Sequence, residues 1–292
     1  MDVFELASQP TVVCACGIPF DFLHDLAKSV GLSADDYVFW RSRSLTFNLD
    51  GKTRIIQSSN LCTFDKLRFM TDLVKASDAT FKWRTRFQPE DATGYDLVVD
   101  ATGTRQVLGK LPADRHYMAY QVKAKFKEPP DFYFQLMKTP AYMWLFPLTE
   151  KTAYVGYASE NPSGARQAVE TCLNQHQATA LQKQAKVLRL NPPYQSQPNT
   201  KGNIIGTGNS IGAITSFGEG NDPSAQTARL LAENIHDPQE YQKQTLRQLN
   251  WINHDHKAHQ AWMQNKRLKL LYHTLRIRKV YWQRYKPRVD YH

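Results

Sequence analysis

The stretch Tyr142-Met143-Trp144-Leu145-Phe146-Pro147 alternates three large aromatic side chains with aliphatic residues and ends in a proline. Successive side chains of a β-strand point to opposite faces, so we expect the three aromatic rings to line one face. Pro147 has no backbone N–H and indicates where the strand ends. Alternating aromatics usually form packed core, but they also form the wall of a binding cavity. Both interpretations stay open at this point.

The segments around this stretch predict an antiparallel sheet. From residue 117 to residue 157, strand-like runs alternate with turns, and Val155-Gly156-Tyr157 belongs to the last run. The turns are expected at residues 128–131, 138–140 and 149–151, each rich in Pro, Thr or charged residues.

A different kind of strand precedes this sheet. Tyr95-Asp96-Leu97-Val98-Val99-Asp100-Ala101-Thr102-Gly103 is an apolar run that stops at small residues. A run that is apolar on both faces is typical of a central parallel strand. Gly103 at its carboxyl end would let a ligand approach the backbone closely.

A glycine-rich turn follows the sheet. Asn203 to Gly212 predicts a short strand that feeds this turn, and Phe217-Gly218-Glu219-Gly220 leads into a helix over residues 224–234. Backbone amides at such a turn and helix start can hold an anion or the polar edge of a flavin. Glycine-rich turns also occur for steric reasons alone, so both interpretations stay open.

The first half of the chain contains mixed elements. The segment from Met1 to Leu6 reads as a strand that ends at Glu5, where an acid would accept hydrogen bonds from ribose hydroxyls in a dinucleotide-binding unit. Cys14-Ala15-Cys16-Gly17 forms a loop. Further elements are expected as follows: helices over 21–30, 64–75 and 165–186, a hairpin over 43–58, and a strand over 80–87.

Composition is that of a folded globular protein. The 292 residues are 41% hydrophobic and 12% aromatic, and no apolar run approaches the roughly 20 residues that cross a bilayer. The N-terminus lacks the pattern of a secretory signal, so we expect a cytoplasmic protein with reduced thiols.

Cys14, Cys16, Cys62 and Cys172 lack metal-ligand spacing, and for His254, His256 and His259 a solvated helix is favoured over a metal site.

The net charge of +10 is concentrated at the C-terminus. After Gln264 there are nine Lys or Arg residues, among them Lys286 and Arg288, and one acid, Asp290. Apolar residues at helical spacing predict a basic amphipathic helix; they are Leu268, Leu271, Tyr272, Leu275 and Trp282. It could pack on its own domain, lie on anionic lipid at the membrane periphery, or bind phosphate backbones. Nucleic acid is not an expected partner, because no recognised module frames Tyr281, Trp282 and Tyr285.

Several of these motifs, in this order, resemble the geranylgeranyl reductase family. They are Cys16-Gly17, Phe64-Asp65-Lys66, Asp96–Gly103, Tyr142-x-Trp144-x-Phe146-Pro147, and the strand into Phe217-Gly218-Glu219-Gly220. The resemblance covers roughly residues 1 to 235 and implies the para-hydroxybenzoate hydroxylase fold. The expected class is α/β (α+β). A discontinuous, incomplete Rossmann-like FAD-binding domain would span 1–112 and 198–236, an antiparallel-sheet substrate domain 113–197, and a basic helical region 237–292.

The resemblance also implies a chemistry, namely saturation of isoprenoid double bonds with FAD as the cofactor. Tyr142, Trp144, Phe146 and Pro147 would line the slot for the isoprenoid lipid substrate. Cys16 would be the catalytic-site residue. The cofactor-binding residues would be Glu5, Cys16, Gly17, Ala101, Gly103, Gly206, Thr207, Gly218, Glu219 and Gly220. The electron donor would be NAD(P)H or ferredoxin.

Two departures from the family pattern keep other functions open. Met1 falls where the second strand of the FAD-binding unit should begin, so no GxGxxG turn is present, which suggests an internal methionine or a shortened relative. Gly206-Thr207 stands where the family has Gly-Asp. One alternative is a flavin monooxygenase or halogenase of the same fold, although the halogenase pattern Trp-x-Trp-x-Ile-Pro fits less well. The other is a degenerate, non-catalytic relative that binds a prenyl lipid or a partner.

Overall fold

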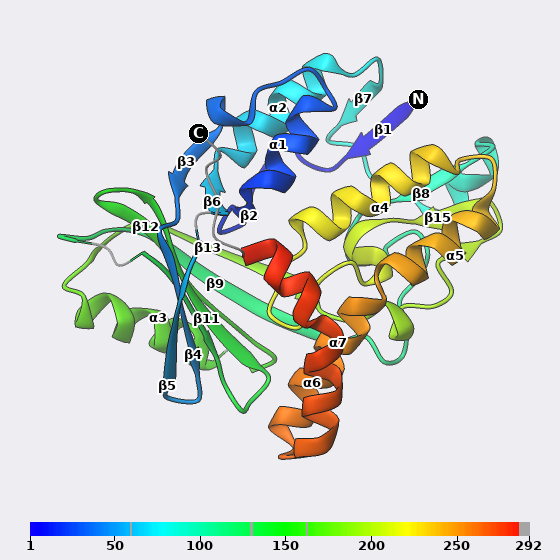
Figure 1. Cartoon of the computed structure of the whole chain (residues 1–292). Helices are drawn as coiled ribbons and strands as arrows, with labels where there is room; N and C mark the ends of the chain where they lie inside the picture. The colour runs from blue at the N-terminus through cyan, green and yellow to red at the C-terminus, as the bar shows by residue number, and fades with distance from the viewer. Residues whose placement is uncertain (59, 129–130, 162, 286–292) are drawn as a thin grey trace, which may run out of the picture.

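The computed structural model describes residues 1–58, 60–128, 131–161 and 163–285. A large, mostly antiparallel sheet forms one side of the molecule, and smaller sheets with helices α1, α2, α4 and α5 form the other (Figure 1). Helices α6 and α7 lie between these two parts (Figure 1). Expectations for Pro129, Pro130, Lys286, Arg288 and Asp290 lie outside the described residues.

The large sheet has seven strands, and the aromatic stretch lies in one of them, β11. The order is β13 (Thr179–Arg189), β9 (His116–Lys125), β12 (Thr152–Ser159), β11 (Ala141–Thr149), β10 (Phe132–Leu136), β4 (Ser44–Leu49) and β5 (Lys52–Gln57). All pairs are antiparallel except β10 with β4. The predicted antiparallel sheet and the predicted hairpin over 43–58 are both confirmed.

The hairpin β4–β5 nevertheless joins the large sheet, although the sequence analysis placed it with residues 1–112. Its partner β10 lies some 85 residues downstream in the chain, with Leu45 opposite Phe132. A parallel pairing of such distant segments depends on the tertiary structure, and no local pattern encodes it.

Three small sheets make up the second part. They are β1 (Asp2–Glu5) with β7 (Thr80–Trp83), the triple β14 (Thr200–Lys201), β15 (Ile204–Gly206) and β8 (Val98–Asp100), and the triple β2 (Gly17–Pro19), β6 (Leu61–Phe64) and β3 (Val38–Arg41). Strand β8 is parallel to β15, as predicted, but it lies at an edge of its sheet among the described residues. The prediction of a central strand is therefore wrong here, and Val99 is exposed.

Seven α-helices occur in the described residues, and one predicted helix has the wrong length. They are α1 (Phe20–Lys28), α2 (Lys66–Ala76), α3 (Ser163–Gln175), α4 (Asn221–Glu233), α5 (Pro238–Gln248), α6 (Asn250–Met263) and α7 (Arg267–Tyr285). Short 3-10 turns occur at Ala34–Asp36, Pro89–Gly94, Pro193–Gln195 and Gly208–Ile211. The helix of wrong length is the one predicted over 165–186, which stops at Gln175 and is followed by β13. This exposed, polar edge strand pairs with β9. Pairing with β9 therefore outweighs the local preference of this segment for a helix.

The aromatic alternation in β11 is confirmed and divides the core in two. Tyr142 and Trp144 pack in one cluster with Phe134 and Phe217, whereas Met143 and Leu145 pack in a second cluster against α3. Each fully buried large apolar side chain stabilises the fold by about 1.5–3 kcal/mol. The first cluster faces α6 and α7, where the candidate site lies.

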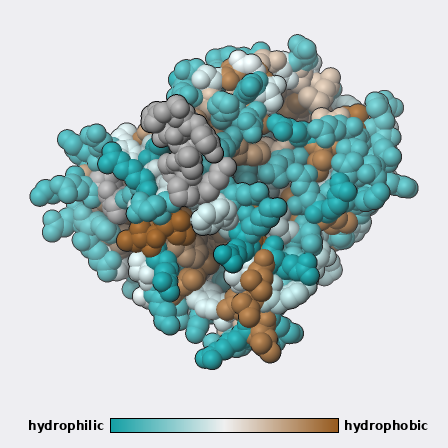
Figure 2. All heavy atoms as spheres, viewed as in Figure 1, coloured by the Kyte–Doolittle hydropathy of each residue, from teal (hydrophilic) through white to brown (hydrophobic). Residues whose placement is uncertain are grey.

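One face of the molecule is largely hydrophilic. Hydrophobic atoms gather on it over the β4–β5 hairpin and over the α6–α7 pair (Figure 2).

Candidate functional site

An apolar cavity of about 470 Å³ lies between the large sheet and the helices α6 and α7. The sheet contributes Leu45, Phe47, Leu49, Phe134, Leu136 and Phe146, and the helices contribute Ala258, Trp262, Leu270, Ile277 and Tyr281. Its lining also includes the carboxylates of Glu219 and Asp255 and the imidazole of His259. A space of this kind accepts an apolar molecule and offers it a few polar groups.

The predicted aromatic wall lies at and behind this cavity. Phe146 lines the cavity directly, whereas Tyr142 stacks behind Phe134, with ring centroids 5.8 Å apart. Trp144 packs over Gly156 in the core, and its Nε1 atom is buried without a hydrogen-bond partner. Pro147 accepts a hydrogen bond of 2.6 Å from the Thr63 hydroxyl through its carbonyl. Of the four predicted substrate residues, Phe146 is the one that faces the cavity.

Asp255 places a buried carboxyl group in the cavity wall. One of its oxygens accepts a hydrogen bond of 2.7 Å from the Ser216 backbone N–H, and the other accepts one of 2.8 Å from the Tyr281 hydroxyl. Burial raises the pKa of Asp255 above its ordinary value because the charged form loses solvation. The group can therefore hold a proton closer to neutral pH than an exposed aspartate does.

His259 lies one helical turn after Asp255 on α6 and also lines the cavity. Its Nε2 atom is buried and has no hydrogen-bond partner, and burial lowers its pKa. His256 is buried as well and shares a hydrogen bond of 2.9 Å with the carbonyl of Ile214. The interpretation of this segment as a solvated helix is therefore wrong for both residues, because α6 is packed against the rest of the fold on this face.

The Gly218-Glu219-Gly220 turn lies where α7 docks onto the fold. Arg284 on α7 pairs with Glu219 at 3.0 Å and forms a two-pronged contact with Asp222 at the start of α4. Glu219 also accepts a hydrogen bond from the Tyr285 hydroxyl. Burial raises the pKa of Glu219, while the positive charge of Arg284 opposes that rise. The predicted cofactor residue Glu219 thus takes part in holding α7 over the cavity.

The loop Cys14-Ala15-Cys16-Gly17 meets the aromatic strand. A Cβ atom added to Gly17 would lie 2.6 Å from the Phe146 ring, so only glycine fits this contact. Cys16 is buried, its backbone is left-handed with φ of 61°, and its neighbour's sulfur and burial raise the pKa of its thiol.

Cys14 is the cysteine of this loop whose thiol pKa is lowered. A hydrogen bond from the Cys16 thiol and the positive charge of Lys66 hold the pKa of Cys14 well below its ordinary value. The sequence-based prediction included Cys16 but not Cys14. The spacing of two residues between these cysteines, with Lys66 elsewhere in the chain, was the signal that could have pointed to Cys14.

The turn at Gly206-Thr207 is filled by its own chain. The Thr207 hydroxyl shares a hydrogen bond of 3.0 Å with that of Thr227, and the Gly208 N–H donates to the same Thr227 oxygen. Leu108 and Ile211 pack so closely on Gly206 that a Cβ atom would lie about 2.5 Å from them. The Thr207 N–H donates a hydrogen bond of 3.0 Å to the Asp100 carbonyl, so the Thr207 and Gly208 amides are both already bonded within the fold.

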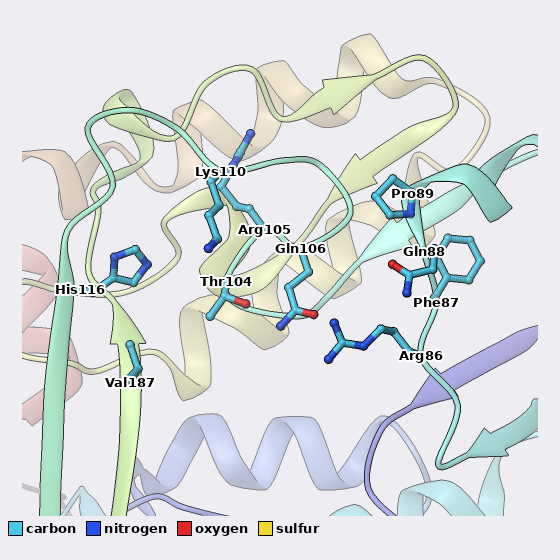
Figure 3. A pocket seen from close by; sticks show the side chains of 10 residues that line it. All are labelled: Arg86, Phe87, Gln88, Pro89, Thr104, Arg105, Gln106, Lys110, His116 and Val187. Carbon is cyan, nitrogen blue, oxygen red and sulfur yellow. The ribbon is translucent and has the colours of Figure 1, made fainter.

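A second, polar groove of about 610 Å³ lies beside the carboxyl ends of β7 and β8. Arg86 and Gln88 follow β7, and Thr104, Gln106 and Lys110 follow β8. Figure 3 shows the side chains of Arg86 and Gln106 pointing toward one another across it. The Thr104 hydroxyl is buried without a hydrogen-bond partner.

Of the ten predicted cofactor residues, Glu5, Ala101 and Gly103 lie next to this groove, and none of the ten is among its lining residues. Ala101 and Gly103 come just before Thr104, and the carbonyl of Glu5 accepts a hydrogen bond of 3.0 Å from Thr85, which precedes Arg86. Cations, amides and an unpartnered hydroxyl together suit a phosphate-bearing group. Arg86 and Lys110 were missed by sequence reasoning, because isolated cations in loops are common and carry no spacing signal.

The described residues contain no cluster of three or more His, Cys, Asp or Glu side chains able to hold a metal ion. They also contain no helix of the length and apolarity needed to span a bilayer.

No protein-family model matches the sequence, and no curated protein sequence matches it. Solved structures do match the fold. A geranylgeranyl bacteriochlorophyll reductase-like protein from Thermoplasma acidophilum aligns with a TM-score of 0.69 and 15% identity, over 89% of this chain and 80% of that one. PqsL from Pseudomonas aeruginosa, described as a probable FAD-dependent monooxygenase, aligns with a TM-score of 0.60 and 11% identity over 92% of both chains.

The flavin-dependent halogenase CmlS aligns with a TM-score of 0.62 and 13% identity, over 87% of this chain and 58% of that one. At such identities the likeness concerns the fold alone. The chain therefore has the mixed α/β fold of FAD-dependent oxidoreductases, which is the expected fold class, and the neighbours include a reductase-like protein, a monooxygenase and a halogenase.

Proposed function

We propose that the protein is an FAD-dependent oxidoreductase that reduces carbon–carbon double bonds in an isoprenoid chain. The observation that carries this proposal is the apolar cavity between the large sheet and α6–α7, with Asp255 buried in its wall. An isolated alkene offers no hydrogen-bonding group, so a protein can help mainly by positioning it and excluding water. A cavity lined by Phe47, Phe134 and Phe146 is suited to that task.

The polar groove is the place that fits the diphosphate portion of FAD. Its unpartnered Thr104 hydroxyl and the cations Arg86 and Lys110 match the donors that phosphate oxygens require. Bound and reduced, the flavin supplies hydride. The electrons that reduce the flavin must come from an external donor such as NAD(P)H or ferredoxin.

Asp255 supplies the proton in this scheme. Saturation of one double bond adds a hydride to one carbon and a proton to the other, so two hydrogens enter and no group leaves. The desolvated Asp255 carboxyl holds that proton, while Ser216 and Tyr281 fix its orientation. Glu219 is less suitable as a donor because Arg284 stabilises its charged form.

The test begins with cofactor binding. Protein supplied with FAD and then reduced with dithionite under anaerobic conditions should convert a geranylgeranyl compound into products heavier by two hydrogens per bond, as followed by mass spectrometry. Asp255→Asn should lower that rate about 100-fold or more while leaving FAD binding unchanged. Phe146→Ala should weaken substrate binding. Retained FAD without any saturation of the alkene would contradict the proposal.

Two alternatives rest on specific observations. PqsL and CmlS share the fold at TM-scores near that of the reductase-like protein, which supports a monooxygenase or halogenase. Consumption of oxygen with hydroxylated or halogenated product would favour it. The edge of β8, which has no partner strand among the described residues, and the internally bonded Gly206–Gly208 turn support a non-catalytic binder of prenyl lipid. Lipid binding in protein that never takes up FAD would favour that reading.

A further inference from the structure

Helix α7 has two apolar faces, and one of them lines the cavity inside the fold. Leu270, Ile277 and Tyr281 point inward and line the cavity. On a helix, residues advance by roughly 100° per position, which places these three on one side of α7.

The opposite side carries an exposed apolar stripe, here named the outer stripe. Its members and exposed fractions are Leu268 84%, Leu271 58%, Tyr272 50%, Leu275 59% and Trp282 68%. By helical geometry these residues span an arc of about 100°, which is the width of a face that usually packs against something. A contiguous exposed apolar surface of this kind marks an interaction site.

The charge around the outer stripe identifies its partner. On one flank lie Lys269 and Arg276 and on the other Arg267 and Arg278, while Lys279 lies within the arc. All five are exposed, and α7 has no acidic residue. An apolar stripe bordered by cations on both sides is the pattern of a helix that lies in the headgroup layer of an anionic membrane.

The helix is also held in place for such a contact. Arg284 fixes the end of α7 through its buried pairs with Asp222 and Glu219, and the backbone carbonyl of Arg284 accepts a hydrogen bond of 2.9 Å from Asn60. The outer stripe is therefore a fixed outer surface of the docked helix. Ile55 and Ile56 of the edge strand β5 are also exposed, and Ile56 lines the cavity together with the inner face of α7.

We propose that α7 is a membrane-surface anchor whose outer stripe inserts into the headgroup layer of an anionic bilayer. The cavity on the inner side of the same helix then lies next to the lipid, with Ile55 and Ile56 beside it. This placement does not require the proposed reaction, since it follows from α7 and its surroundings alone.

Vesicle flotation tests the proposal with the full chain. Binding is measured to vesicles of phosphatidylcholine alone and to vesicles with about 30 mol % phosphatidylglycerol, at low and high salt. We expect binding to the anionic vesicles that weakens with salt. The double variant K269Q/R276Q should bind roughly 5-fold more weakly for each charge removed. The double variant L271Q/L275Q should lose on the order of 10-fold per side chain.

A matched control is Leu181→Gln, which removes a comparably exposed leucine from β13, at the opposite edge of the large sheet. It should bind like the original protein. A second readout is tryptophan emission, which should shift to the blue on anionic vesicles and lose much of that shift in Trp282→Phe. Circular dichroism confirms that each variant is folded.

Three results would overturn the proposal. The first is absence of binding to anionic vesicles, and the second is an equal loss in Leu181→Gln. The third is a dimer in sedimentation that L271Q/L275Q dissociates while vesicle binding is unchanged, which would assign the outer stripe to a second copy of the chain.

Discussion

The seven-stranded sheet and the small parallel sheets differ in how completely their strands are paired. In the large sheet, β9, β12, β11, β10 and β4 each have a partner on both sides, and α3 covers one face. On the other side of the molecule, β1 pairs with β7 alone and β8 with β15 alone among the described residues. The region proposed to hold the substrate is thus the better packed one, and the region proposed to hold FAD has open strand edges.

Strands that are paired on one side only are stabilised less by backbone hydrogen bonds than strands paired on both sides. An isolated pair of strands is marginally stable in water, because half of its backbone groups remain open to solvent. Ile204, Val98 and their neighbours form only a small apolar cluster there. We therefore expect the two regions to respond differently to perturbation.

Hydrogen exchange should show the largest contrast. Amides of β11 and β12 should exchange only through global unfolding, whereas those of β1 and β7 should open locally, with a difference of about 1,000-fold or more. Mass spectrometry of peptides covering these strands measures it. Similar protection in both regions would mean that they unfold as one unit, and a rise in β1 and β8 protection on adding FAD would locate the cofactor.

Removing the buried guanidinium of Arg284, where α7 docks onto α4, should have the next largest effect. Arg284→Met leaves Asp222 and Glu219 close together without their partner and should lower the free energy of unfolding by about 3–5 kcal/mol. Chemical denaturation measures this change. The loss should be larger at pH 8 than at pH 5, because burial raises the pKa of Glu219 and Arg284 no longer opposes that rise in the variant, so protonation of Glu219 at the lower pH relieves the repulsion.

The control for this substitution is Arg278→Met, which removes an exposed cation from the same helix and should change stability by less than about 0.5 kcal/mol. If both variants lost the same stability, the paired cation would have no special role in docking α7.

A smaller effect is expected inside the large sheet. Gly156→Ala places a methyl group about 2.0 Å from the Trp144 ring, so the ring must move and stability should fall by about 1–3 kcal/mol. The same substitution at Gly164 on α3 meets no atom within 4 Å and should be neutral or stabilising. Thermal unfolding of the two variants tests this, and equal shifts would show that the Trp144 contact does not constrain the core.

Sequence periodicity predicted the elements whose apolar side chains recur at the spacing of a strand or a helix. The alternation at Tyr142–Phe146 predicted the strand and its two faces, and the pattern over 43–58 predicted the hairpin. The spacing of Leu268, Leu271 and Leu275 gave the amphipathic helix α7. In each case the burial pattern repeats with the period of the element, so local sequence is sufficient.

The tertiary structure decided which faces are covered and which residues meet. Thr179–Arg189 forms a strand because it pairs with β9. The outer stripe of α7 is exposed because the opposite face of that helix lines the cavity. Asp255 and Arg284 carry no local signal. Their altered pKa values arise from burial and from partners distant in sequence, such as Tyr281 and Asp222. The electrostatic environment of a side chain depends on which residues pack around it in three dimensions, whereas the period of a strand or helix is visible in the sequence itself.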